Sequence, residues 1–164
     1  MKVLGIDPGT HNVGYGVLEK NNGAIRSLEY GVVRSIARMD LSFRLGEIYR
    51  KLDTIIGQIK PDIISIEKVF FGVNVKSAIS LGEGRGIVLL LADLHDIEIH
   101  EFSPTQIKKA VTGNGRAQKY QIQKMMQGLL KLKDMPGSED AADALASAYC
   151  FLNSSKFQQL IKQT

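Results

Sequence analysis

The sequence has almost no cysteine and no long apolar run. Cys150 is its only cysteine, which excludes an intrachain disulfide and suits a reducing compartment. The longest unbroken apolar run covers residues 87–92, far shorter than the roughly 20 residues that span a bilayer. Residues 1–8 include an acid and a proline before any apolar stretch of signal length, so no secretory signal is predicted. We therefore expect a cytoplasmic protein that does not act in a membrane.

Length and composition favour one ordinary globular domain. The chain has 164 residues, of which 44% are hydrophobic and 23% charged, and these values exclude disorder of the whole chain. The length suits one domain and leaves little room for two. We expect a single domain over residues 1–152, followed by a tail at 153–164 that shows no partner signal and frays.

Acidic residues are absent from residues 102–133, although the net charge of the whole chain is only +4. The same stretch contains seven basic residues, which are Lys108, Lys109, Arg116, Lys119, Lys124, Lys131 and Lys133. A stretch of one sign favours a polyanion such as nucleic acid as partner. A pair of solvated helices that happen to be basic would explain the charges equally well, so both interpretations stay open on this feature.

The hydrophobic pattern alternates between strand and helix periods. It predicts strands at residues 2–7, 12–20, 24–34, 62–67 and 97–102, and helices near 41–59, 76–95, 104–113, 118–132 and 138–151. The sequence Asn-Asn-Gly at 21–23 predicts a hairpin turn, so the first three strands should form an antiparallel meander. The fourth strand is almost wholly apolar, which is typical of a strand buried on both faces. We expect an α/β fold with a mixed sheet and helices on its faces.

Four acidic residues stand at the ends of predicted strands or in the first two turns of the last predicted helix. Asp7 ends the first strand, Glu67 ends the fourth, and Asp140 and Asp143 share one face of the last helix. Each alone has an ordinary explanation, such as a turn acid or an acid that complements the helix dipole. The dipole explains Asp143 poorly, because Asp is an unfavourable residue one turn inside a helix.

Together these acids predict a metal site. The ends of the first and fourth strands should be neighbours in a sheet whose middle is parallel, and a helix packed on that sheet could add its two acids. Four carboxylates in one cleft repel each other unless cations lie between them. Oxygen ligands without Cys or His suit Mg²⁺ or Mn²⁺, and two such ions catalyse in-line attack on a phosphodiester.

Three motifs in register resemble the RuvC-type Holliday junction endodeoxyribonucleases: residues 5–10 (GIDPGT), 66–70 (IEKVF) and 140–146 (DAADALA). The resemblance covers about residues 1–152. It implies an RNase H-like fold with a five-stranded mixed sheet, and a homodimer that places paired, symmetric nicks at a four-way DNA junction with two Mg²⁺ per active site. It also implies that the catalytic and metal-binding acids are Asp7, Glu67, Asp140 and Asp143, and that a branch-migration motor is a partner.

The resemblance extends more loosely to DNA-binding residues. Phe70 matches an aromatic residue that stacks on a base near the junction centre. Lys108 and Lys119 match basic residues that hold DNA near the site, and both lie in the acid-free stretch. Weaker candidates for DNA contact are Lys76, Arg85, Lys109 and Arg116. His11 follows the Asp7 turn, but it lacks a second histidine at ligand spacing and receives no role.

Three other interpretations remain open on the sequence alone. A nuclease of the same fold could act on structured RNA. The strand and turn at residues 5–10 also resemble the first phosphate loop of actin-like sugar kinases and chaperone ATPases, although those proteins need two such domains. A non-catalytic nucleic-acid-binding module is the last, and the four intact carboxylates argue against it because unused acids in a DNA cleft repel the ligand.

Overall fold

The computed structural model describes residues 1–68 and 75–154. The strands are β1 (Lys2–Asp7), β2 (Asn12–Asn21), β3 (Ala24–Arg34), β4 (Ile63–Glu67) and β5 (Glu98–Phe102). The helices are α1 (Leu41–Ile59), α2 (Val75–Leu94), α3 (Pro104–Thr112), α4 (Lys119–Leu129) and α5 (Glu139–Leu152). In these described ranges, no helix is both long and apolar enough to cross a bilayer.

The five strands form one mixed sheet in the order β3-β2-β1-β4-β5. The first three strands are the predicted antiparallel meander, and β1 pairs in parallel with β4, which pairs in parallel with β5. The turn between β2 and β3 places Asn22 and Gly23 at φ values of 48° and 82°, the left-handed region that Asn and Gly tolerate best. The sheet therefore has the predicted topology, with β1 and β4 side by side.

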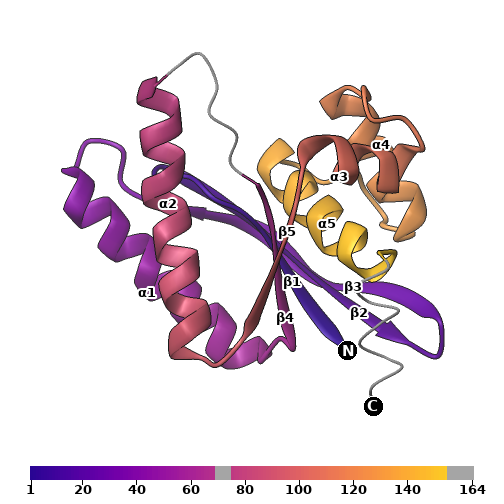
Figure 1. Ribbon diagram of the computed structural model, residues 1–164, viewed down its shortest axis with the longest axis horizontal. Coiled ribbons are helices and arrows are strands. Elements are labelled where there is room, and N and C mark those ends of the chain that lie inside the picture. The colour runs from indigo at the N-terminus through magenta and orange to yellow at the C-terminus, as the bar shows by residue number, and fades with distance from the viewer. Residues whose placement is uncertain (69–74, 155–164) are drawn as a thin grey trace.

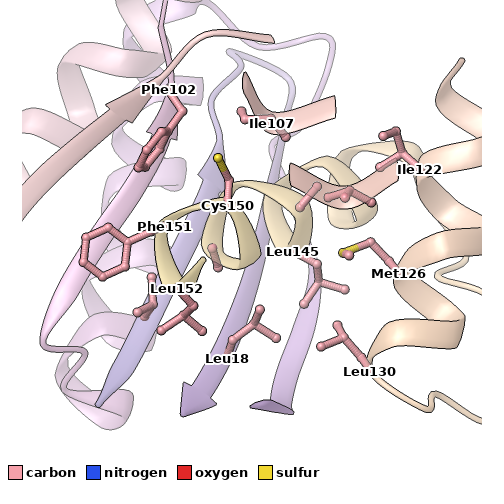
Figure 2. Close-up of a cluster of buried hydrophobic side chains, with 14 of the residues drawn as sticks. Leu18, Phe102, Ile107, Ile122, Met126, Leu130, Leu145, Cys150, Phe151 and Leu152 are labelled. Atoms are coloured by element: carbon pink, nitrogen blue, oxygen red, sulfur yellow. The ribbon is translucent and has the colours of Figure 1, made fainter. Parts of the chain in front are cut away.

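Helices cover both faces of this sheet (Figure 1). The helices α1 and α2 lie on one face, and α3, α4 and α5 lie on the other. Side chains alternate along the strands, so each strand supplies both cores. On β1, Leu4 and Ile6 join the core beneath α1 and α2, whereas Val3 joins the core beneath α5. Figure 2 shows the second core, in which side chains of α5 meet those of α3 and α4.

Helix α5 lies unusually close to the sheet because the strand glycines Gly5, Gly14 and Gly16 face it. A Cβ atom added to Gly5 would overlap the backbone oxygen of Ala144, and one added to Gly14 would overlap the backbone oxygen of Asp140. Ten of the residues of α5 are buried, so this helix forms the centre of its layer. The close approach sets the depth at which the acids of α5 stand above the sheet.

Two details differ from the sequence expectations. Helix α4 ends at Leu129 rather than near Leu132, because Lys131 adopts a left-handed φ of 52°. His100 lies on the edge strand β5, a position that by itself predicts an exposed side chain. Its side chain is nevertheless buried, with its ring 4.7 Å from the ring of Phe151 on α5. Phe151, the next-to-last residue of α5, supplies this contact, which strand periodicity alone does not indicate.

Candidate active site

The acids of the two central parallel strands lie at the same edge of the sheet. The register pairs Gly5 with Ser65 and Ile6 with Ile66, so Asp7 and Glu67 end neighbouring strands. The alternation of side chains places Asp7 on the same face as Gly5, which is the face covered by α5. Glu67 shares a face with Ser65, whose hydroxyl contacts α5. Both carboxylates therefore point toward that helix.

Helix α5 supplies the other two acids. Asp143 stands one turn before Ser147, the residue that contacts Ser65 on β4. The backbone of Asp140 lies over Gly14, and Gly14 pairs with Asp7 across the sheet. The helix begins after Ser138, so Asp140 and Asp143 stand in its first two turns. This packing brings both acids of α5 toward Asp7.

Three of the four acids line one small pocket of about 250 Å³. Its full lining is Asp7, Glu67, Pro104, Ile107, Lys108, Lys119, Ile122 and Asp143. Asp140 is not part of the lining, although its charge acts on both Asp7 and Asp143. The pocket thus combines carboxylates from β1, β4 and α5 with lysines from α3 and α4.

Burial and mutual repulsion disturb the ionisation of these acids. Burial is the main cause that raises the pKa of Asp7 from 3.8 to about 7, and the charges of Asp143, Asp140 and Glu67 add to it. Burial also raises the pKa of Glu67 and of Asp143, while the nearby charge of Lys119 lowers both. Three carboxylates and two lysines line the pocket, so its formal charge is negative when all five groups are ionised.

Two lysines of the acid-free stretch face this pocket. Lys108 stands in α3, which begins directly after β5 because Ser103 caps it and Pro104 occupies its first position. The Ser103 hydroxyl accepts a hydrogen bond from the backbone N–H of Gln106 at 3.2 Å. Lys119 opens α4, and its Nζ lies 3.8 Å from an Asp143 carboxylate oxygen. A phosphate group near the carboxylates would thus meet two positive charges.

The donor chemistry of the pocket fits Mg²⁺ or Mn²⁺. All four candidate ligands are carboxylates, and hard divalent ions prefer such oxygen ligands. Burial and the charges of the neighbouring carboxylates raise the pKa of Asp7, and a bound cation would offset both effects. Within residues 1–68 and 75–154, however, no three His, Cys, Asp or Glu side chains lie close enough together to ligate one ion as they stand. The donor groups of the pocket are those of a divalent-ion site, but the described carboxylates are not close enough together to ligate one ion without moving.

The remaining predicted contacts lie at varying distances from the pocket. Arg116 is exposed in the connection between α3 and α4, and Lys109 is exposed in the last turn of α3. Arg85 forms an ion pair with Glu101 of β5, so its charge is already partnered. Phe70 lies outside the described residues, and so does the side chain of Lys76.

Three further contacts involve residues for which the sequence indicates no role in the site. His11 hydrogen bonds to the guanidinium of Arg44 and is not part of the carboxylate pocket. The carboxylate of Glu139, the first residue of α5, lies 3.1 Å from Lys119 Nζ. The buried contact between Ser65 and Ser147 was not predicted. For Glu139, the only signal in the sequence was its position next to Asp140.

Comparison with known proteins gives a consistent result along the whole chain. The family model described as crossover junction endodeoxyribonuclease RuvC matches residues 3–151. A protein of that description from Alkaliphilus metalliredigens is 41% identical over 162 residues, covering 99% of each chain. Another from Petrotoga mobilis is 47% identical and covers 93% of this chain and 94% of its own.

A solved structure gives the same result for the fold. The structure of Thermus thermophilus RuvC in complex with a Holliday junction substrate matches with a TM-score of 0.88 and 30% identity, covering 96% of each chain. This match confirms the expected RNase H-like fold. The family match decides against an actin-like nucleotide-binding domain and a non-catalytic module. The chain belongs to the RuvC family of crossover junction endodeoxyribonucleases, the Holliday junction resolvases of recombination and repair.

Proposed function

We propose that Asp7, Glu67, Asp140 and Asp143 hold two divalent ions, normally Mg²⁺ with Mn²⁺ as a substitute, and hydrolyse a DNA phosphodiester with them. The observation that carries this proposal is the shared pocket, in which carboxylates of β1, β4 and α5 line about 250 Å³. When bound, such a pair of ions supplies an activated water and stabilises the leaving 3′ oxygen. Residues 1–152 form the nuclease domain in this proposal.

The chain's own residues prepare the pocket for that chemistry. Burial of Asp7 at the end of β1 favours its neutral form until a cation compensates the neighbouring charges. The Nζ atom of Lys119 at the rim, and that of Lys108 in the lining, supply positive charge for the scissile phosphate. Ile107 and Ile122 form the apolar part of the wall and limit the access of bulk water.

The proposed substrate is four-way junction DNA. The Thermus thermophilus relative is described in complex with a Holliday junction substrate, and the basic stretch beside the pocket suits a DNA backbone. We assign Lys108 and Lys119 to the phosphate nearest the cut, and Lys109, Arg116, Lys76 and Arg85 to more distant phosphates. Phe70 would stack on a base at the opened junction centre.

Two symmetric nicks on a two-fold junction require two active sites, so we propose a homodimer as the active form. A branch-migration motor that turns the junction within this dimer is the proposed further partner. Because chromosomal DNA is the proposed substrate, the protein would work in the cytoplasm.

Cleavage of a labelled synthetic junction tests this function. We expect paired nicks that need Mg²⁺ or Mn²⁺, disappear in EDTA, and are absent from linear duplex and from structured RNA. The variants Asp7→Asn, Glu67→Gln, Asp140→Asn and Asp143→Asn should each lose cleavage by about 1,000-fold or more, while they still bind the junction in Ca²⁺.

The matched control is Asp93→Asn. Asp93 is exposed on α2, on the opposite face of the sheet from the pocket. This variant should cleave like the native chain. Full activity in any of the four site variants would remove that residue from the metal site, and preferential cutting of RNA would overturn the proposed substrate.

A further inference from the structure

The carboxylate of Glu139 is the nearest acidic partner of Lys119. Lys119 Nζ lies 3.1 Å from Glu139 Oε2 and 3.8 Å from Asp143 Oδ2. Glu139 is the first residue of α5, and Lys119 is the first residue of α4, so two helix N-termini meet at this contact. The ammonium of Lys119 is therefore shared between a carboxylate of the pocket and one at its rim.

The shared contact matters because Lys119 is a long, flexible side chain beside a cluster of acids. The side chains of Lys119 and Glu139 are 61% and 55% exposed, whereas that of Asp143 is 29% exposed. Without Glu139, the ammonium of Lys119 would be attracted most strongly to the more buried acids of the pocket, above all Asp143. There it would occupy the oxygen atoms that a divalent ion needs, because one carboxylate oxygen serves a lysine and a metal ion poorly at once.

We propose that Glu139 is a positioning residue: it holds the ammonium of Lys119 at the rim of the pocket and so leaves Asp143 available to a divalent ion. The inference rests on the proposed function, because it takes Asp143 as a metal ligand. It assigns Glu139 no contact with the reacting atoms. Its charge acts through Lys119, and the contact at 3.1 Å is where it acts.

The test is a double-mutant cycle on metal binding, with Mn²⁺ as the only ligand and no DNA. Calorimetric titration would give the Mn²⁺ dissociation constants of the native chain, Glu139→Gln, Lys119→Met and the double variant. Glu139→Gln should weaken Mn²⁺ binding by about 3- to 5-fold in the native background, a range typical of one partly exposed ion pair. In the Lys119→Met background it should weaken binding by less than about 1.5-fold, because no ammonium remains to be moved.

This cycle separates the inference from a general effect of charge. If Glu139 acted only as a distant negative charge, or if it ligated the metal itself, its removal would weaken Mn²⁺ binding at least as much without Lys119. Such an equal or larger loss in the Lys119→Met background would overturn the inference. The control Asp134→Asn removes one negative charge from the exposed connection before α5 and should change Mn²⁺ binding by less than about 1.5-fold.

The same titrations distinguish failure of this inference from failure of the proposed function. Mn²⁺ binding that is lost in Asp143→Asn but shows additive effects of Glu139→Gln and Lys119→Met would leave the metal site standing and overturn the role of Glu139. No carboxylate-dependent Mn²⁺ binding in the native chain would overturn both. Glu139→Asp supplies a second check, because it should restore part of the affinity that Glu139→Gln loses.

Discussion

The hydroxyl of Ser65 lies 2.8 Å from the backbone oxygen of Ser147 and 2.9 Å from its hydroxyl oxygen, and both side chains are buried. This pair joins the middle of β4 to α5. Glu67 lies two residues beyond Ser65 on the same face of the strand, and Asp143 lies one turn before Ser147. The contact thus fixes how far along the helix axis the acid of α5 stands from the acid of β4.

Replacing Ser65 should therefore lower the stability of the folded chain. Ser65→Ala leaves the buried Ser147 hydroxyl without this partner, which should lower the free energy of unfolding by about 1–2 kcal/mol. Urea unfolding measures the loss. The control is Thr54→Ala, because Thr54 is exposed and donates only to the backbone oxygen of Arg50 in its own helix. It should cost less than about 0.5 kcal/mol, and equal losses in the two variants would contradict the role of the buried pair.

Neutralising Asp7 should stabilise the metal-free protein at alkaline pH. The pKa of Asp7 is about 7 in the folded chain, whereas that of an unperturbed aspartate is 3.8. Folding therefore favours the protonated form. Stability is therefore lost as pH rises from about 4 to 7, and the full penalty remains above that range. In EDTA at pH 8, Asp7→Asn should be more stable than the native chain by on the order of 1–3 kcal/mol.

That gain should disappear at low pH. Near pH 4 the native Asp7 is already protonated in the folded chain, so the two proteins should unfold with nearly the same free energy. Urea unfolding at both pH values checks the difference. A gain of the same size at pH 4 and pH 8 would mean that the substitution acts through packing and not through charge.

Divalent ions should stabilise the native chain and leave the site variants unchanged. An ion that binds only the folded state at 100 times its dissociation constant adds about 2.7 kcal/mol. At pH 8, Mg²⁺ or Ca²⁺ should therefore raise the Tm of the native chain by several degrees. Asp143→Asn should show little of this increase, while Asp93→Asn should match the native chain. A Tm increase of equal size in all three proteins would indicate unspecific binding.

Filling the space at Gly5 should force α5 away from the sheet. A Cβ atom there would overlap the backbone oxygen of Ala144, and backbone atoms of a buried helix have little room to move. We expect Gly5→Ala to cost about 2 kcal/mol or more and to reduce cleavage strongly. Gly57→Ala in α1 is the control, because an added Cβ meets no atom within 4 Å. It should stabilise the chain by up to about 1 kcal/mol.

Much of the fold follows from local signals in the sequence. The apolar run before Glu67 indicated a strand buried on both faces, and the four residues of β4 before Glu67 are all buried. The Ser-Pro pair at 103–104 indicated a helix start, and Ser103 does cap α3. Such signals succeed because each depends on a few neighbouring residues. The parallel pairing of β1 and β4 followed from the same patterns, since their two acids were expected at one sheet edge.

Contacts between segments distant in the chain could not be predicted from the sequence. His100 is buried against Phe151 near the end of α5, and nothing in β5 itself indicates that contact. Glu139 reaches Lys119 only because two helix starts meet, a relation that spans 20 positions of the chain. The ion pair between Arg85 of α2 and Glu101 of β5 was likewise not indicated by the sequence. These relations depend on the packing angle of the helices, which periodicity does not encode.

The parallel pairing of β1 and β4 fixes the spacing of Asp7 and Glu67, which can change only by whole-residue shifts in strand register. A slip of one residue between the strands would turn one carboxylate to the opposite face of the sheet, because side chains alternate along a strand. Intermediate spacings therefore do not exist. Sequence drift in either core weakens this protein gradually, but the distance between the two strand acids stays the same until the sheet itself re-pairs. A chain of this fold can thus exchange most of its core side chains and keep the geometry on which two of its carboxylates depend.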